Sequence, residues 1–273
     1  MRLGVSSSLG AQNAQQWAKS NVDLGLKSVV FPLNCNATDS EVDEYVKAAK
    51  ENDLLIAEVG IWCNAIDEDP QKAKKNLEYS INQLRLADKI GARCAVNVAG
   101  AYCGPRWDGA AKENFSKECF AKTVKMIQTV IDEANPINTY FSIEPMPWMI
   151  PTGPEEYLNL IEAVGRDRFA VHMDIINMIN CPERYFSPGE FLQKCFDLLK
   201  GRIRSCHLKD ILLLQDFTFQ LKECACGEGT FCIEKYAELA SKEDPDMPMI
   251  IEHLSGDDAY KESVAYVRDR LNV

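Results

Sequence analysis

The stretch INTYFSIEPMPW, residues 137–148, holds an apolar β-type run that ends on Glu144 and is followed by two prolines. A carboxylate at the end of a buried strand needs a partner, because charged side chains are rarely buried alone. Strand-like runs of this kind recur along the whole chain, separated by segments with helical periodicity. The eight runs cover residues 3–7, 28–33, 54–59, 94–99, 139–144, 169–174, 203–208 and 249–254.

Helical patterns fill the gaps between these runs. Residues 39–53 begin with an Asp/Ser start signal, and residues 70–91 carry a proline at the first position and a glycine at the last. Nearly continuous apolar strands suit a parallel sheet covered on both faces, joined by right-handed strand–helix–strand units. Eight such units predict an α/β fold, a (β/α)8 TIM barrel that forms a single domain over residues 1–273. Further helices are predicted at residues 113–134, 154–164, 188–200, 232–242 and 257–271.

An open, doubly wound sheet is the alternative fold, but the first strand–helix turn carries no G-x-G-x-x-G pattern and the chain has no P-loop. One connection departs from a simple turn. Residues 210–230, after the seventh strand, are too long and too rich in β-formers for a plain loop, so they predict a small β-hairpin inserted over the barrel mouth. This insertion is interpreted either as a lid or as a packing element.

Charge and composition limit the function classes. The formal net charge of −11 argues against binding nucleic acid, because that affinity comes from Lys and Arg side chains on phosphates. The chain begins without the apolar stretch of a signal peptide, and no apolar run approaches the roughly 20 residues that cross a bilayer. Its 11 cysteines are scattered and odd in number, which suits free thiols in a reducing compartment. We therefore expect a cytoplasmic protein that binds neither nucleic acid nor membrane.

Four strands in the second half of the chain end on a side chain that can ligate a metal: Glu144, Asp174, His207 and Glu252. They are spaced by about one strand–helix unit, so all four should meet at the carboxyl end of the barrel. Three carboxylates cannot sit together ionised in a partly dry pocket without a cation. Oxygen ligands with one histidine favour one divalent ion, Mn²⁺ first, then Mg²⁺ or Co²⁺, with Zn²⁺ as a further candidate. Any one of these residues alone would more often cap a loop or pair with an arginine.

The motifs IEPMPW, HMDIIN, CHLKD and IEHL, in this order, resemble the sugar isomerase/epimerase superfamily of xylose-isomerase-like barrels over essentially the whole chain. The resemblance implies that Glu144, Asp174, His207 and Glu252 bind one divalent metal. It also implies that Glu144 and Glu252 are catalytic, serving as acid and base on opposite faces of a bound sugar.

Three positions depart from the patterns of particular relatives. Xylose isomerases carry a lysine where this chain has Met146, and ketose 3-epimerases carry a second glutamate where it has Ile150. Many relatives have a histidine at Asn177, which can hydrogen-bond a hydroxyl but cannot shuttle a proton. Endonuclease IV, another relative by fold, needs many histidines for three zinc ions, and this chain has three in all. These departures disfavour a hydride-shift isomerase and a DNA-repair enzyme.

Together these features predict a metal-dependent isomerase or epimerase that acts on a sugar or oxo-sugar. The glutamates would move a proton next to the carbonyl through a metal-stabilised enediolate. Return to the same carbon gives epimerisation, and return to the adjacent carbon gives isomerisation. A lyase or hydratase that acts on 3-oxo-glycosides by β-elimination is the alternative enzyme. A non-catalytic sugar-binding or partner subunit is the alternative from another class, and a homo-oligomer is expected by analogy only.

Several further residues are candidates for substrate contact. Lys209 could hold an enediolate oxygen or bridge rim carboxylates. His172 shares the inward face of Asp174, although a core histidine is the more common case. Loop tryptophans suit the C–H faces of sugars but can also plug the barrel mouth. Glu58 ends the third strand and could contact substrate or support the metal ligands from behind. The full set is Glu58, Trp62, Arg106, Trp107, Trp148, His172, Asn177 and Lys209.

Two neighbours of the proposed ligands have predicted supporting roles. Asp210 is expected to orient His207 as a hydrogen-bond acceptor or to bind Lys209. His253 has the opposite strand parity to Glu252, so it should face the helix layer or turn at the strand end, and it is assigned a structural role.

Overall fold

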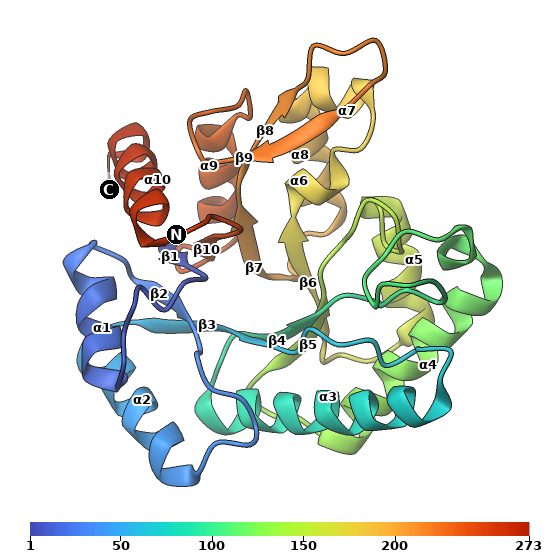
Figure 1. Ribbon diagram of the computed structural model, residues 1–273, viewed down its shortest axis with the longest axis horizontal. Helices are drawn as coiled ribbons and strands as arrows, with labels where there is room; N and C mark the ends of the chain where they lie inside the picture. The colour runs from blue at the N-terminus through green and yellow to red at the C-terminus, as the bar shows by residue number, and fades with distance from the viewer. Residues whose placement is uncertain (273) are drawn as a thin grey trace.

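A barrel of parallel strands forms the centre of the computed structural model, which describes residues 1–272 (Figure 1). Within this range eight strands form one sheet in the order β1-β10-β7-β6-β5-β4-β3-β2. The barrel is nearly closed, because β1 and β2 are joined by bonds from Lys27 N to Leu3 O (2.9 Å) and from Ser28 Oγ to Arg2 O (2.8 Å). The strands are β1 (Arg2–Val5), β2 (Ser28–Val30), β3 (Leu55–Gly60), β4 (Cys94–Asn97), β5 (Tyr140–Ile143), β6 (Phe169–Asp174), β7 (Ile203–Leu208) and β10 (Pro248–Ile251).

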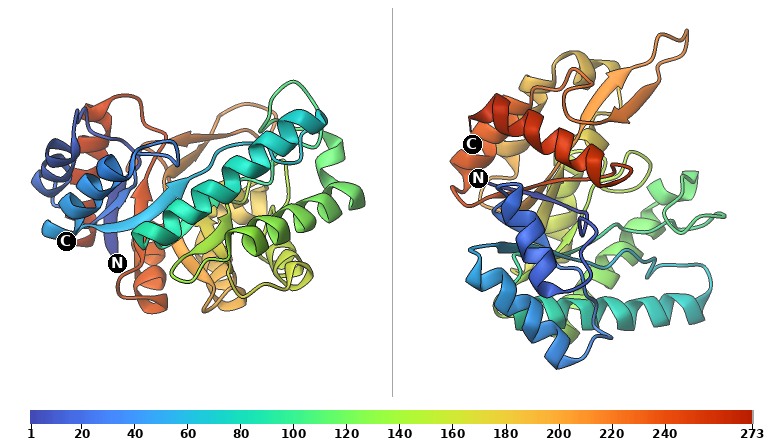
Figure 2. Two further views of the ribbon diagram at one scale, coloured as in Figure 1. Left: turned by 90° about the horizontal axis from the view of Figure 1, so that it is seen from below. Right: turned by 60° about the vertical axis from the view of Figure 1, so that its left-hand side comes forward.

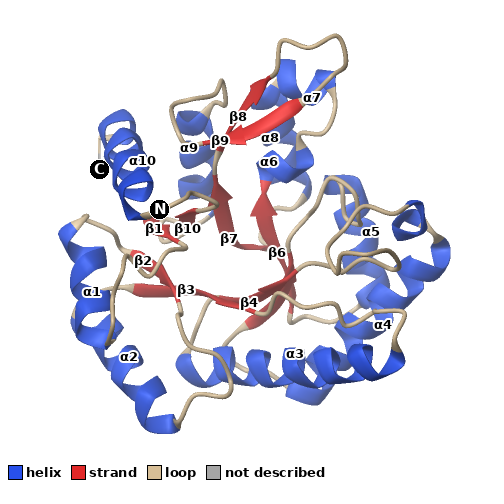
Figure 3. Ribbon diagram, viewed as in Figure 1, coloured by secondary structure: helices blue, strands red, loops and turns tan. Residues whose placement is uncertain are grey.

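Helices surround the strands as an outer layer, which Figure 3 shows in blue around red. The part of the chain that the structure describes has ten α-helices and one 3₁₀ helix. They are α1 (Ala14–Asp23), α2 (Asp39–Glu51), α3 (Pro70–Ile90), η1 (Lys112–Phe115), α4 (Lys117–Ala134), α5 (Pro154–Val164), α6 (Ile175–Met178), α7 (Pro182–Phe186), α8 (Pro188–Leu198), α9 (Ile233–Glu243) and α10 (Asp257–Leu271). The predicted TIM barrel is therefore confirmed. No helix among residues 1–272 is long and apolar enough to span a bilayer.

Local sequence signals explain where the helices begin and end. Helix α2 starts with a reciprocal capping box between Thr38 and Glu41. Helix α3 starts at Asp69, whose side chain accepts two backbone N–H groups, and ends at Gly91 in the left-handed conformation with φ 69°. Helices α6 and α7 were not among the predicted elements. Each spans at most five residues, too few for helical periodicity to be visible in the sequence.

Two buried tyrosines anchor the helix layer to the strands that carry the candidate ligands. Tyr157 on α5 donates to the carbonyl of Ile143, the last residue of β5. Tyr236 on α9 donates to the carbonyl of Met173 in β6, at 2.7 Å. Both acceptors immediately precede a candidate ligand in the chain. These bonds therefore fix the strand ends at the place where the site is built.

The predicted hairpin is present after β7. Strands β8 (Asp210–Leu213) and β9 (Leu221–Cys224) pair antiparallel, and the hairpin projects beyond the barrel (Figure 2). Asp210 faces away from the barrel interior, as strand alternation after the inward Lys209 requires. Its carboxylate accepts four backbone N–H groups, from Ile211 (2.8 Å), Gly227 (3.0 Å), Gly229 (3.1 Å) and Phe231 (2.9 Å). Asp210 thus organises the loop between β9 and α9, and the expectation that it serves His207 or Lys209 is wrong.

Replacing Asp210 by Asn should destabilise the protein by about 2–4 kcal/mol, because an amide cannot accept all of these buried N–H groups. Urea unfolding measures the change. Asp246→Asn is the matched control, since Asp246 lies on the surface with its side chain 62% exposed and forms an ion pair with Arg2. Its cost should stay below about 1 kcal/mol. Equal free energies of unfolding for the two variants would contradict this role of Asp210.

Candidate metal centre

The four predicted ligands come together at the carboxyl end of the barrel. Glu144 follows β5, Asp174 ends β6, His207 lies near the end of β7 and Glu252 follows β10. Asp174 and His207 are direct partners in the β6–β7 register. All four side chains are buried, and each offers one ligand atom within 4.8 Å of the others. The four-residue set is called the quartet below.

His207 lies at the centre of the quartet. Its Nδ1 atom is 2.8 Å from Glu252 Oε1, 3.4 Å from Glu144 Oε1 and 3.7 Å from Asp174 Oδ2. Three oxygens from three strands therefore face a single nitrogen. Such a donor set, with mostly carboxylate oxygens, suits a divalent cation.

Unsatisfied polar atoms support the same assignment. Asp174 Oδ2, His207 Nδ1 and Glu252 Oε1 are buried and form no hydrogen bond of acceptable geometry with any described residue. Buried polar atoms are nearly always hydrogen-bonded, so three unsatisfied atoms that converge on one point require a further partner. The residues present thus fit a bound divalent metal ion, although they do not specify which one.

Lys209 is the cation closest to the quartet in the structure. Its side chain is buried, and Nζ lies 2.6 Å from Asp174 Oδ2 and 2.6 Å from Glu252 Oε1. The same two oxygens have no acceptable hydrogen bond within residues 1–272, so the ammonium sits at ion-pair distance but off their hydrogen-bonding directions. Lys209 therefore bridges two rim carboxylates, one of the two arrangements expected for it.

Burial and charge act differently on the two glutamates of the quartet. Burial, reinforced by the Glu252 carboxylate and opposed by His207, raises the pKa of Glu144 to about 7. Burial also disfavours the charged form of Glu252, but His207 and Lys209 outweigh it and lower that pKa to about 2. The pKa of Asp174 is lowered well below its usual value by Lys209 in spite of burial. Unequal environments thus separate two otherwise equivalent glutamates.

Asn177 is, with Lys209, a substrate-contact candidate that lies directly on the quartet. Its Nδ2 donates to Glu144 Oε1 at 2.9 Å and lies 3.5 Å from Met146 Sδ. Its backbone N–H donates to Asp174 Oδ1 at 3.0 Å. Helix α6 therefore positions Asn177 so that it orients two of the ligand carboxylates.

Glu58 and His172 lie beneath the quartet in the barrel interior. His172 Nε2 is 2.9 Å from Glu58 Oε1, and His207 Nε2 is 3.3 Å from Glu58 Oε2. Both side chains are at most 1% exposed. The structure thus brings them to the site from below rather than from the open mouth.

The loop residues predicted to contact substrate make their described contacts outside the quartet. Trp148 is partly buried and donates to the carbonyl of Asp108 at 2.7 Å. Arg106 pairs with Asp108 at 3.0 Å and, with Trp107, lines a hollow of about 690 Å³ between the β3 and β4 loops. Trp62 is 42% exposed. No quartet residue belongs to the described lining of that hollow, so a substrate role for these four side chains stays a prediction.

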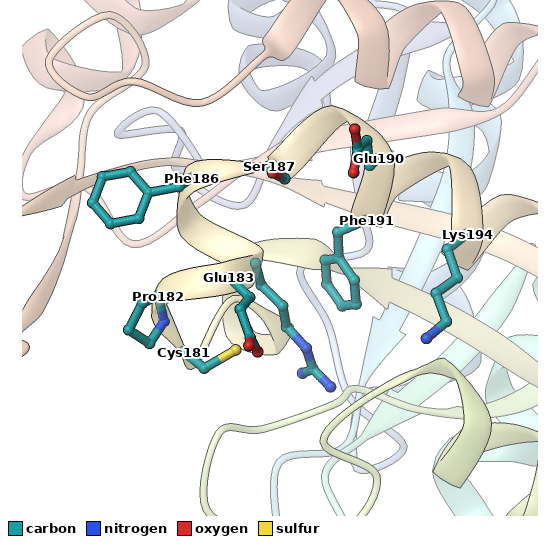
Figure 4. A pocket seen from close by; sticks show the side chains of 9 residues that line it. Cys181, Pro182, Glu183, Phe186, Ser187, Glu190, Phe191 and Lys194 are labelled. Atoms are coloured by element: carbon teal, nitrogen blue, oxygen red, sulfur yellow. The ribbon is translucent and has the colours of Figure 1, made fainter.

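A second hollow, of about 740 Å³, lies over α7 and α8 (Figure 4). Arg184 in its wall donates to the carbonyls of Thr152 (2.8 Å) and Met178 (2.7 Å), which ties the β5–α5 loop to the end of α6. Within the described residues its lining contains no member of the quartet. The residues that line this hollow therefore stabilise neighbouring loops and are separate from the candidate metal centre.

Two further residues at the mouth were not predicted to lie there. Glu223 on β9 lies 3.4 Å from Lys209 Nζ and 3.1 Å from His253 Nδ1. His253 Nε2 lies 3.5 Å from Glu252 Oε2. Strand parity predicts that His253 faces the helix layer or turns at the strand end, and the structure shows the turn: β10 ends at Ile251 and His253 adopts a left-handed φ of 60°. That turn directs its ring back to the mouth, and no sequence signal places Glu223 there.

Divalent metal should stabilise the folded protein through the quartet. At a free Mn²⁺ concentration 100-fold above Kd, the free energy of unfolding should rise by about 2.7 kcal/mol relative to protein in EDTA. Thermal unfolding with and without Mn²⁺ measures the shift in Tm. Asp174→Asn should lose most of this shift because a charged ligand is removed, whereas Asp246→Asn on the surface should keep it. An unchanged shift in Asp174→Asn would count against the quartet as the metal site.

Removing the buried ammonium should be costly in metal-free protein. Lys209→Met leaves Asp174 and Glu252 without their nearest cation, so we expect a loss of about 3–5 kcal/mol in EDTA. Added Mn²⁺ should recover more stability in this variant than in the wild type. Lys194→Met is the control, because Lys194 forms a half-exposed surface pair with Glu155 and should cost less than about 1 kcal/mol. Urea unfolding of both variants, with and without Mn²⁺, measures these losses. Equal losses in free energy of unfolding for the two variants would refute the role of Lys209.

Comparisons with known proteins show which folds are similar to this one. No curated protein matches the sequence significantly. The structure is similar to D-psicose 3-epimerase solved in the presence of D-fructose (TM-score 0.72, 15% identity, 100% of both chains covered). It is also similar to 3-keto-D-glucoside 4-epimerase from E. coli (TM-score 0.68, 13% identity, 98% of this chain and 99% of that chain). A third similar structure is a probable 3-DHS dehydratase of Bacillus anthracis involved in petrobactin synthesis (TM-score 0.72, 15% identity, 99% and 100%).

At these identities the structural similarities establish the fold alone. The family model described as xylose isomerase-like TIM barrel, in contrast, matches residues 21–270, which is most of the chain. The protein therefore belongs to the xylose isomerase-like TIM barrel family.

Proposed function

We propose that the protein is a divalent-metal-dependent isomerase or epimerase that moves a proton next to the carbonyl of a sugar or oxo-sugar. One observation carries the proposal: Glu144 and Glu252 converge on the same four-donor site from strand ends that are not neighbours in the sheet. Strands β7 and β6 separate β10 from β5. Two carboxylates on different walls of one pocket can remove a proton from one face of a bound carbon and return it from the other.

The quartet would hold the cation through Glu144, Asp174, His207 and Glu252. A bound divalent ion supplies Lewis-acid stabilisation of negative charge on a carbonyl oxygen. Glu144 and Glu252 then hold and release the transferred proton at their carboxylate oxygens. Asn177 keeps Glu144 in place through its 2.9 Å hydrogen bond, and Lys209 keeps Glu252 in place at 2.6 Å.

Met146 favours proton transfer over a hydride shift. It stands where xylose isomerases have a lysine that holds the substrate carbonyl oxygen, and its sulfur lies 3.5 Å from the neutral Asn177 side chain. A thioether and an amide supply no positive charge at that point. The remaining cation near the quartet, Lys209, is engaged with Asp174 and Glu252.

The substrate class is a carbohydrate with a carbonyl group, either that of a free ketose or one formed by oxidation of a hydroxyl, as in an oxo-glycoside. The structural similarity to a 3-keto-D-glucoside epimerase makes oxo-glycosides worth testing beside free ketoses. The same enolate chemistry can expel a β-substituent, so a lyase on 3-oxo-glycosides is the second candidate, and the similarity to a probable dehydratase favours testing it. All 11 cysteines are free thiols, which suits a reducing compartment, so we place the reaction in the cytoplasm. Mn²⁺ is the first metal ion to test.

Deuterium exchange should identify the reaction. Mn²⁺-loaded protein is incubated in D₂O with free ketoses and, separately, with 3-oxo-glycosides, and after chelation the products are followed by NMR. Incorporation of deuterium next to the carbonyl without release of the aglycone is the expected result. Release of the aglycone would replace the proposal by the lyase, and neither signal with bound sugar would indicate a binding subunit.

Neutralising either glutamate should stop the exchange. Glu144→Gln and Glu252→Gln should each lower the rate by about 10²- to 10⁴-fold, the usual contribution of a positioned acid or base. Glu78→Gln, an exposed glutamate on α3, is the matched control and should exchange at the wild-type rate. Full exchange and full metal content in both site variants would rule out this mechanism.

A further inference from the structure

We infer that Glu58 is the positioning residue for His207: it holds the proton on Nε2 of the imidazole and so presents Nδ1 to the cation. This inference rests on the proposed metal-dependent function, because Nδ1 must have a cation to ligate. Glu58 itself does not touch the substrate in this assignment. The sequence predicts two roles for Glu58, contact with the sugar or support of the metal ligands, and this inference selects the second.

The carboxylate of Glu58 reaches His207 across the barrel interior. Glu58 lies on β3 and His207 on β7, and in the sheet order these strands are separated by β4, β5 and β6. In an eight-stranded barrel such strands lie on opposite walls. Glu58 Oε2 is 3.3 Å from His207 Nε2, and Glu58 is 1% exposed. Both carboxylate oxygens of Glu58 are already hydrogen-bonded inside the barrel, which leaves neither for a sugar.

The chemistry of the two side chains decides the position of the proton. An ionised carboxylate only accepts hydrogen bonds, and an imidazole that ligates a metal ion is neutral and has one N–H. The contact with Glu58 therefore requires the N–H on Nε2, which leaves a lone pair on Nδ1. That nitrogen faces three quartet oxygens at 2.8–3.7 Å and has no acceptable hydrogen bond among the described residues. A lone pair directed at carboxylate oxygens is favourable only with a cation between them.

Two more donors hold Glu58 in this position. His172 Nε2 lies 2.9 Å from Glu58 Oε1, and the Ser205 hydroxyl donates to the same oxygen. Glu58 thus receives one donor on Oε2 and two on Oε1. The His172 ring also packs edge-on against the His207 ring, with centroids 4.1 Å apart and planes at 76°. Both ring packing and the carboxylate restrict rotation of the ligand imidazole, the usual task of groups behind a metal-binding histidine.

A second cation between Glu58, His172 and His207 is the competing interpretation, since these three residues also form a potential ligand group. The separations of 2.9 Å and 3.3 Å are those of direct hydrogen bonds, and they use the very atoms that a second ion would need. We therefore expect one metal ion per chain. A stoichiometry of two would overturn the inference.

Nitrogen NMR of the wild-type protein tests the proton position directly. The chain has three histidines, so ¹⁵N-histidine labelling with His253→Gln leaves the signals of His172 and His207, and His207 is the one whose Nδ1 shift changes most on metal binding. In protein loaded with Mg²⁺, which is diamagnetic, we expect the His207 proton on Nε2. A proton on Nδ1 would overturn the inference, and this test needs no variant of Glu58.

Metal affinity tests the consequence. Glu58→Gln should raise the Kd for Mn²⁺ by about 10- to 100-fold, the usual effect of losing the hydrogen-bond partner of a metal-binding histidine. Circular dichroism should report an intact fold. Ser205→Ala, which removes one donor to Glu58, should weaken it less and serves if the first variant does not fold. Glu78→Gln on the surface should bind as wild type. Wild-type Kd values in both interior variants would overturn the inference and leave the proposed function standing, whereas a wild type that binds no Mn²⁺ refutes the proposed function itself.

Discussion

Buried negative charge at the barrel mouth is the constraint on which the rest of this structure depends. Glu58, Glu144, Asp174 and Glu252 are all nearly inaccessible and surround His207. Four carboxylates cannot be buried together unless each has a compensating partner. Glu58 has three donors, Glu144 has Asn177, and Asp174 and Glu252 share Lys209. The carboxylate oxygens that face His207 Nδ1 are not fully compensated by these partners. A cation fits at this point.

The surrounding fold holds these groups at fixed distances. Tyr157 and Tyr236 reach from the helix layer to the carbonyls of Ile143 and Met173, each one residue before a ligand. The inserted hairpin contributes from the other side, with different residues in different roles. Asp210 organises the loop that follows β9, and Glu223 contacts Lys209 and His253 at the mouth. The hairpin is thus connected to the candidate site through side chains and not only through the backbone.

Much of this arrangement is predictable from the sequence, and its gaps have physical reasons. Glu144, Asp174, His207 and Glu252 could be found because parallel strands place their last residues on one edge of the barrel. The same alternation argument leaves His253 either facing the helix layer or turning at the strand end, and only the structure shows the left-handed turn after β10. Asp210 looked like a partner of His207 from its closeness in the chain, yet its carboxylate binds a loop that lies 17 to 21 residues further on. No sequence pattern predicts that Glu223 lies at the mouth, because its position depends on how the β8–β9 hairpin packs against the barrel.

Two levels of specification can therefore be separated in this protein. The sequence by itself determined the strand–helix alternation, the barrel and the four candidate ligand positions, because periodicity and strand direction are local properties of the chain. Only the tertiary structure decided which partner each buried charge would find. The pairs Glu58–His207, Lys209–Asp174 and Glu223–His253 join elements far apart in the chain, and a buried charge is stabilised by whatever side chain the fold brings within hydrogen-bonding distance, not by its sequence neighbours.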